Sequence, residues 1–298
     1  MIIVSILGFL IFLSLLTLLF CYKQSDRILI RKSKYTPLTI FPSQFNAPFE
    51  EVSFTNRENM QLKGWFIPSV EKSDKTIIFF HGWGQNKGEI LSNTIFLRKK
   101  GFNLFYFDFR GSGESAQGRS SIGYLEAQDA ISALDYILDS RPEETKHIGV
   151  YGLSMGAAVA IYIAAHRREV GCVIAEACYF SYEKVVARWA RLHKKAPYFP
   201  LVPLTLFFAR KRLGFNPEDY SPKNNIKRLA RNKKPILIIT GTLDNLAPCK
   251  DAKALFLATN YPKQIWLVEG AKHTECAKVA GPEYQERLCE FYTKYLSV

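Results

Sequence analysis

The ten residues HIGVYGLSMG, residues 147–156, decide how the rest of the chain is interpreted. β-Branched side chains in their first half indicate a strand, and the alanine-rich run directly after them indicates a helix. Ser154 lies at the junction, with Gly152 two residues before it and Gly156 two residues after it. A serine exposed on a sharp strand-to-helix turn needs small residues at both places, because side chains there would clash. We therefore predict that Ser154 is a nucleophile at the tip of a buried strand.

The surrounding chain alternates short apolar runs with helical patterns. We expect strands at residues 51–55, 62–67, 76–80, 103–107, 147–151, 170–175, 235–240 and 264–268. Helical patterns lie at residues 87–100, 123–140, 156–166, 250–259 and 282–296. This alternation predicts an α/β fold, with a mostly parallel sheet of about eight strands flanked by helices. The first two strands, joined by a polar turn, should form an antiparallel start to the sheet.

The alternation breaks between about residues 178 and 232, after the sixth strand. This insertion mixes aromatic residues, prolines and a basic run at residues 210–212. Ligands of open α/β sheets bind at the carboxyl ends of the strands, so we expect the insertion to form a helical cap over a site there. Whether its basic edge contacts lipid or only solvent stays open at this point.

A serine hydroxyl becomes a good nucleophile only when a base removes its proton and a third group orients that base. For a serine on such a turn, an acid and then a histidine follow later in the chain. His81 and His147 come too early. His166 lies in the helix after the serine, and His193 lies in the insertion. His273, in a loop after the last strand, remains as the candidate base.

Two acidic residues follow strands in the allowed interval. Asp244 ends the stretch TGTLD, a strand followed by a turn, after the seventh strand. Glu176 follows the sixth strand. We favour Asp244 because its placement fits the acid of such a triad better, and Glu176 stays the alternative.

Acyl transfer also requires hydrogen-bond donors directed at the oxygen on which negative charge develops. One donor is the backbone N–H of the residue after the nucleophile, which is Met155 here. The other comes from the loop after the third strand, where FFHGWG at residues 79–84 makes the N–H of Trp83 the natural candidate. His81 is then expected to hold this loop.

Residues 1–22 carry no charge and are long enough to cross a bilayer as a helix. The absence of a preceding basic residue and of a small-residue cleavage site favours a retained anchor over a signal peptide. The residues after it are expected to form an extended linker over 23–48, which leaves 49–298 as the hydrolase domain. Basic residues follow the apolar segment at Lys23, Arg27, Arg31, Lys32 and Lys34. Because positively charged flanks usually stay in the cytoplasm, they predict a cytoplasmic catalytic domain.

The net charge of +13 indicates basic residues that are attracted to anionic lipid headgroups beside the anchor. A nucleic-acid partner is not expected, because the sequence contains no nucleic-acid recognition module. The six cysteines have neither zinc-site nor disulfide-framework spacing, so we expect no metal. Residues 111–116 formally fit G-x-G-x-x-A, but residues 123–140 after them are predicted helix where a dinucleotide site needs a strand. We expect a turn held by Asp108 and Arg110, and no cofactor.

Further motifs are LKGWFIP at residues 62–68 and DFRGSGES at residues 108–115. The chain from about residue 49 resembles the membrane-anchored branch of the α/β-hydrolase-domain serine hydrolases. The resemblance rests on these two motifs, on the turn at residues 152–156, which we call the elbow, on HG at residues 81–82, on Asp244 with Pro248, and on His273. The resemblance implies a Ser154, Asp244 and His273 triad, with Trp83 and Met155 as the oxyanion donors. Trp83 departs from the small or polar residue of many relatives, and its bulk should narrow the acyl side of the pocket.

The expected activity is cleavage of a carboxylic ester or thioester through an acyl-enzyme, with a small-molecule or lipid acyl group as substrate. The anchor motivates a lipid or lipidated substrate. A serine peptidase or amidase on the same triad, and a non-catalytic protein that keeps the fold, remain alternatives. The sequence leaves the acyl-chain length and the oligomeric state undefined.

Overall fold

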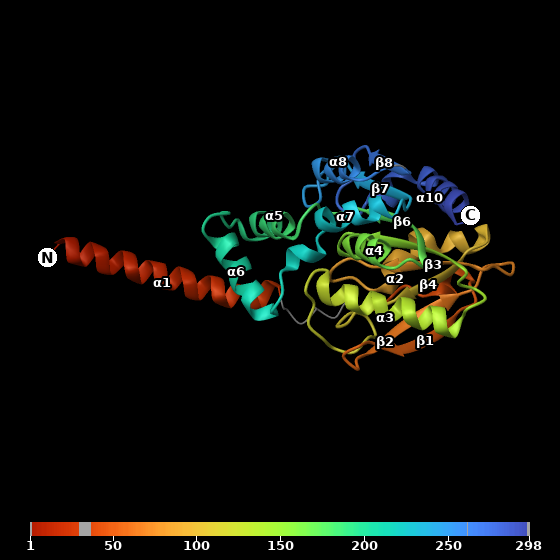
Figure 1. Ribbon diagram of the computed structural model, residues 1–298, viewed down its shortest axis with the longest axis horizontal. Helices are drawn as coiled ribbons and strands as arrows, with labels where there is room; N and C mark the ends of the chain where they lie inside the picture. The colour runs from red at the N-terminus through yellow and green to blue at the C-terminus, as the bar shows by residue number, and fades with distance from the viewer. Residues whose placement is uncertain (1, 30–36, 261, 297–298) are drawn as a thin grey trace.

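An eight-stranded sheet forms the centre of the computed structural model, which describes residues 2–29, 37–260 and 262–296 (Figure 1). The strand order is β1-β2-β4-β3-β5-β6-β7-β8, and β2 runs antiparallel to both of its neighbours while the other pairs are parallel. The strands are β1 Glu50–Thr55, β2 Gln61–Ile67, β3 Lys75–Phe80, β4 Asn103–Phe107, β5 His147–Leu153, β6 Val170–Glu176, β7 Ile236–Gly241 and β8 Lys263–Val268. The predicted α/β fold with an antiparallel start is confirmed.

Helices cover both faces of the sheet. One face packs against α3 Tyr124–Ser140, α4 Met155–His166, α7 Pro222–Arg231 and α8 Cys249–Ala258. The other packs against α2 Lys87–Thr94, the 3-10 helix η2 Ile95–Lys100, α9 Cys276–Ala280 and α10 Pro282–Tyr295. The single helix predicted over residues 87–100 is therefore two elements, and α9 has no counterpart among the predicted helices.

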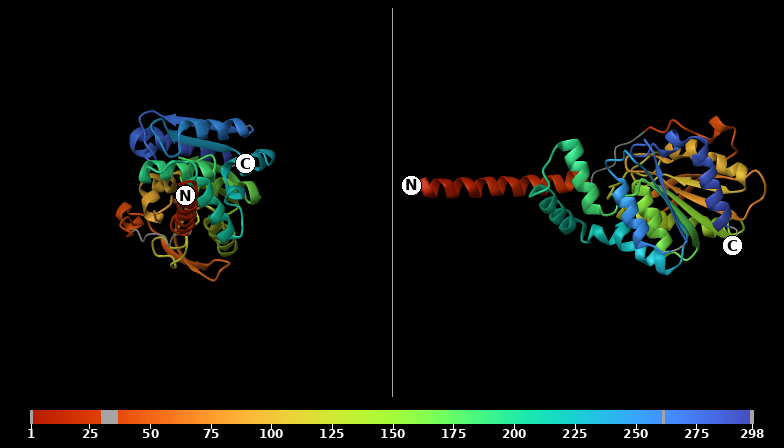
Figure 2. Two further views of the ribbon diagram at one scale, coloured as in Figure 1. Left: turned by 90° about the vertical axis from the view of Figure 1, so that its left-hand side faces the viewer. Right: turned by 90° about the horizontal axis from the view of Figure 1, so that it is seen from above.

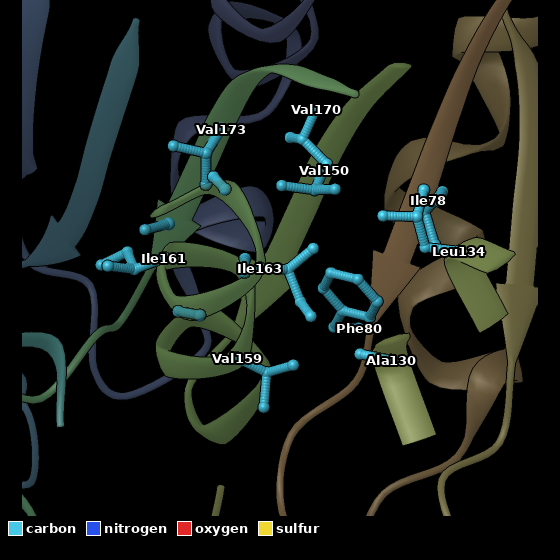
Figure 3. Close-up of a cluster of buried hydrophobic side chains, with 14 of the residues drawn as sticks. Ile78, Phe80, Ala130, Leu134, Val150, Val159, Ile161, Ile163, Val170 and Val173 are labelled. Carbon is cyan, nitrogen blue, oxygen red and sulfur yellow. The ribbon is translucent and has the colours of Figure 1, made fainter. Parts of the chain in front are cut away.

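The core beneath α4 fixes the position of Ser154, directly before this helix. Figure 3 shows Ile78 and Phe80 of β3 and Val150 of β5 facing Val159 and Ile163 of α4. All five side chains are essentially inaccessible to water, and burying each contributes about 1.5–3 kcal/mol. Helix α4 is apolar on all sides, as expected for a helix enclosed by other elements.

The segment between β6 and β7 contains α5 Tyr182–Lys194, α6 Leu201–Leu213, the 3-10 helix η3 Pro217–Tyr220 and α7. Ile226 and Leu229 of α7 belong to the main core beside α4, so α7 is part of the layer that covers the sheet. The predicted cap over residues 178–232 is too long for this reason. Helices α5 and α6 form the cap itself, and Figure 1 shows them beside the domain built on the sheet, near the base of α1.

Helix α1, Ile2–Leu29, projects away from the domain built on the sheet, along the long axis of the molecule (Figure 2). The expectation of an extended linker from residue 23 is wrong for residues 23–29, which continue the helix. No helix-breaking residue stands there, and the Tyr22 ring packs edge-on against Phe208 of α6, with ring centroids 5.5 Å apart. The basic residues expected at 31, 32 and 34 lie outside the described residues. A short 3-10 helix, η1 Pro42–Phe45, precedes β1.

The turn between β5 and α4 consists of one residue. Ser154 adopts φ 55° and ψ −111°, outside the regions that most side chains populate. A Cβ atom on Gly152 would lie 2.1 Å from the Gly156 carbonyl oxygen, and one on Gly156 would lie 2.0 Å from the Phe80 carbonyl oxygen. Neither position has room for a side chain, as the sequence predicts.

Gly156→Ala should therefore destabilise the protein by about 3 kcal/mol, because backbone atoms of β3 cannot move aside without disturbing the core. Gly171→Ala in β6 is the matched control, since its Cβ atom would lie 3.5 Å from the Ile148 carbonyl oxygen, an ordinary contact. The measurement is thermal and denaturant unfolding of both variants in the same detergent. Equal stability of the two variants would contradict the close approach at Gly156.

Candidate active site

Three side chains from separate loops lie in a hydrogen-bonded row at the carboxyl ends of the strands. Ser154 Oγ is 2.9 Å from Nε2 of His273, and Nδ1 of His273 is 2.7 Å from Oδ2 of Asp244. A carboxylate only accepts hydrogen bonds, so Nδ1 carries the proton and Nε2 presents its lone pair to the serine hydroxyl. The arrangement can therefore take a proton from Ser154 and stabilise the resulting imidazolium.

Close packing of two loops fixes the acid beside the histidine. A Cβ atom on Gly241 would lie 2.1 Å from the Ala271 carbonyl oxygen, and the Leu243 N–H donates to that same oxygen at 2.9 Å. The loop after β7 is thus held against the loop after β8, which carries His273. The Asp244 side chain is fully buried, and its Oδ1 accepts the backbone N–H groups of Leu246 and Ala247. Its other oxygen is left pointing at the imidazole.

The alternative acid, Glu176, takes part in a different network. Its Oε2 accepts the hydroxyls of Tyr151 at 2.8 Å and Tyr284 at 2.7 Å. Burial raises the pKa of the Glu176 carboxyl. The structure therefore brings Asp244 and not Glu176 into hydrogen-bond contact with His273, while the Glu176 backbone carbonyl accepts the N–H of Ser154 at 2.8 Å.

The two backbone amides expected to bind an oxyanion border the same pocket as Ser154. Met155 is the first residue of α4, where backbone N–H groups lack partners within the helix. Across the described part of the chain, neither the Met155 N–H nor the Trp83 N–H donates to a protein acceptor. The neighbouring Gly82 N–H is already bound to Oε1 of Gln85 at 2.9 Å. Gln85, which the sequence analysis missed, thus shapes the loop, and no local pattern marks it.

His81 ties the Trp83 loop to the sheet. The Phe109 N–H donates to its Nε2 at 3.0 Å, and its Nδ1 lies 2.8 Å from the Gly82 carbonyl oxygen. Since Nε2 accepts, Nδ1 must donate, which is the neutral tautomer. Burial lowers the pKa of this imidazole, which agrees with a neutral ring. His81 therefore holds the loop, as expected.

A buried charge network supports that loop from below. The Asp108 carboxylate accepts the Lys87 backbone N–H at 2.7 Å, the Lys87 Nζ at 2.6 Å and the Glu114 N–H at 2.9 Å. Arg110 forms a bidentate pair with Asp129. The motif at residues 108–115 is thus a turn folded around Asp108 and secured through Arg110, in agreement with the sequence analysis.

An apolar pocket opens directly over Ser154 and encloses about 480 Å³ with its mouth included. The residues that line it are Trp83, Ile122, Ser154, Met155, Tyr179, Val185, Val186, Trp189 and Leu246. Cap helix α5 supplies one wall, where the Trp189 ring meets the Trp83 ring edge-on at 6.4 Å. No charged side chain lines this pocket, so it suits an uncharged, apolar group. Among the described residues, no cluster of three or more His, Cys, Asp or Glu side chains is arranged to hold a metal ion.

The raised pKa of Glu176 makes part of the folding stability dependent on pH. The folded protein keeps the Glu176 proton at pH values where the unfolded chain has lost it, so stability falls as pH rises through that interval. Glu176→Gln removes this titration. The stability of the variant relative to the original protein should therefore increase as the pH rises above about 4.3, the usual pKa of a glutamate carboxyl, measured by thermal unfolding. A difference that stays constant with pH would contradict it.

Comparisons with known proteins agree with this geometry. Residues 71–213 match the Hydrolase_4 family, described as serine aminopeptidase, S33. The chain is 25% identical to YqkD of Bacillus subtilis over 281 residues, which cover 92% of this chain and 89% of YqkD. It is 26% identical to YfhR of Escherichia coli K12 over 287 residues, with 93% and 92% of the two chains covered.

Among solved structures, the esterase Pf2001 of Pyrococcus furiosus superposes with a TM-score of 0.74 at 27% sequence identity. The match covers 90% of this chain and 98% of the esterase. The sheet order, the one-residue turn at Ser154 and these likenesses show the α/β-hydrolase fold and support a hydrolase, and the structure is esterase-like.

Proposed function

We propose that the protein is a serine hydrolase that cleaves a carboxylic ester or thioester through an acyl-enzyme. Ser154 Oγ bonds to the acyl carbon while its proton passes to Nε2 of His273, and the N–H groups of Trp83 and Met155 hold the oxyanion. The alcohol or thiol leaves with the proton from His273. Water then gives a proton to Nε2, attacks the acyl carbon, and releases the acid with Ser154 restored.

The observation that carries this proposal is the row from Ser154 through His273 to Asp244, opening into an uncharged pocket. The hydrogen bond between Ser154 and His273, 2.9 Å long, suits proton transfer, and the one between His273 and Asp244, 2.7 Å long, orients the imidazole. Because His273 is exposed on a quarter of its side chain while Asp244 is buried, water can reach the base without reaching the acid. That is the access which release of an acyl-enzyme requires.

The membrane setting supports a lipid or lipidated substrate. The described residues contain one helix long and apolar enough to span a bilayer, Ile2–Asp26, a test that a signal sequence also passes. Retention is supported by contacts with the folded domain, because Cys21 and Ser25 are buried and Arg212 of α6 lies over the Tyr22 ring at 3.9 Å. We propose a single-pass anchor followed by the hydrolase domain, with this domain on the cytoplasmic side, where the basic residues after the span favour it.

An amidase or aminopeptidase activity on the same residues is the second candidate, and the description of the matching family favours it. An aminopeptidase must bind the substrate's free ammonium group. The pocket over Ser154 offers no carboxylate for that purpose. Its apolar lining therefore supports an acyl ester or thioester over a peptide with a free amino end.

Ser154→Ala should abolish covalent labelling by a fluorophosphonate probe and lower the hydrolysis of a short acyl ester by about a millionfold, because the nucleophile is lost. Labelling is measured by in-gel fluorescence of the full-length protein in detergent. Ser115→Ala, which alters a hydroxyl bound to the Asp108 backbone carbonyl, is the control and should keep the label. A protein that labels equally with and without Ser154 would rule out the proposed nucleophile.

Asp244→Asn should lower kcat by about ten-thousandfold, because the amide no longer holds His273 in the tautomer that accepts the serine proton. Glu176→Gln should keep kcat within about tenfold, since Glu176 makes no hydrogen bond to His273. Both variants are compared with a short chromogenic ester after their folding is checked by thermal unfolding. The reverse order of effects would assign the acid to Glu176.

A further inference from the structure

A second hollow lies between the cap helices and helix α1, next to the Ser154 pocket. Its walls include Phe20 and Gln24 of α1, Ala190 and Ala196 at the end of α5, and Leu201 and Thr205 of α6. It measures about 1860 Å³ with its open side included. We call this hollow the anchor groove.

The anchor groove and the Ser154 pocket are adjacent. Trp83, Val186 and Trp189 line both of them. The two tryptophans meet edge-on at 6.4 Å, so their rings stand at the junction. A chain attached at Ser154 and too long for the inner pocket would pass these rings and enter the anchor groove.

Contacts between α1 and α6 set where the groove opens. Cys21 is buried, with its Sγ 3.7 Å from the Leu201 carbonyl oxygen, and Arg212 pairs with Asp26 at 3.4 Å. These contacts lie at the end of the span Ile2–Asp26. In a bilayer crossed by this helix, the opening beside Phe20 would lie at the boundary between the acyl chains and the headgroups.

The cap surface beside the opening fits that boundary. Phe199 is 77% exposed and lies in the connection between α5 and α6, whose residues Ala196 and Pro197 line the groove. The exposed Lys194 and Lys195 lie at the end of α5, next to the groove. Exposed aromatic rings with adjacent lysines are typical of protein surfaces at the headgroup level. Figure 1 shows the connection between α5 and α6 on the same side of the domain as α1.

We propose that the anchor groove is a lateral entrance, through which a long acyl chain of a membrane-resident ester or thioester slides from the bilayer to Ser154. Helix α1 forms one wall of this entrance and so selects substrate as well as holding the protein to the membrane. The proposal rests on the hydrolase function and the anchor proposed above. Such a route keeps the chain against a mostly apolar lining, with Lys194, Lys195, Gln24 and Thr205 as its polar members, whereas approach through water would expose every methylene group.

A cross-linking experiment tests the route directly. Full-length protein in vesicles of neutral and anionic phospholipid is labelled with a fluorophosphonate that carries a palmitoyl-length chain ending in a diazirine. After illumination, peptide mass spectrometry should find cross-links in α1 near Phe20 and Gln24 and in the loop after α5. A matched probe with a butyryl-length chain should cross-link only to residues of the inner pocket, such as Val185.

The outcomes separate this proposal from the proposed function. No label at Ser154 would refute the nucleophile itself. A label at Ser154 without long-chain cross-links in α1 would overturn the entrance and leave the hydrolase intact. Cross-links from the long probe to a face of the domain remote from α1 would also overturn it.

A variant provides an independent readout. Ala196→Trp places a bulky ring in the anchor groove at a partly exposed loop position, so folding should tolerate it. The ratio of kcat/KM for a palmitoyl ester to that for an acetyl ester should fall by at least about tenfold, because several methylene contacts are lost. Val70→Trp, at an exposed site beside Arg98, is the control and should leave the ratio unchanged. An unchanged ratio in Ala196→Trp would contradict the route.

Discussion

The close approach of Gly156 to the end of β3 is the constraint on which the site depends. Because Gly156 has no side chain, the first turn of α4 can lie directly against the Phe80 carbonyl at the end of β3. Strand β3 leads into the Trp83 loop. One contact thus sets the position of Ser154 and brings Met155 and Trp83 to the same pocket. The backbone strain at Ser154 is held there by the buried side chains on both sides.

Polar groups beneath the site have a positioning role. Lys87, Asp108, Arg110 and Asp129 are buried, and each finds a charged partner. Buried ion pairs add little net stability compared with apolar packing, but removal of one partner is costly, about 3–5 kcal/mol. Their contribution is therefore to fix one conformation of the loops around His81. A hydrolase needs such rigidity because misplaced donors lose most of their effect on the transition state.

The sequence predicts the strands well because each is a short local run of β-branched and aromatic residues. It places Ser154 and His273 through spacing and chain order. It leaves Asp244 and Glu176 as alternatives, since the tyrosines that engage Glu176 come from β5 and α10, far apart in the chain. The predicted end of the cap at residue 232 is wrong for a related reason. Periodicity can show that α7 has an apolar face, but not that this face packs beside α4 in the main core. The predicted end of the anchor helix is also wrong, because Pro37, Pro42 and Pro48 indicate an extended linker, and that prediction extends back to residue 23 although α1 continues to Leu29.

The packing of α1 on α6 means that the span and the cap are parts of one structural unit. A soluble fragment that begins after Tyr22 would uncover Phe208 and lose the Phe20 side of the groove. Such a fragment could keep the sheet, the elbow and the inner pocket, and it would be the convenient form for crystallisation and screening. Under the entrance proposed above, the acyl-chain preference of such a fragment would be measured with one wall of the groove missing, and it should differ from that of the full chain.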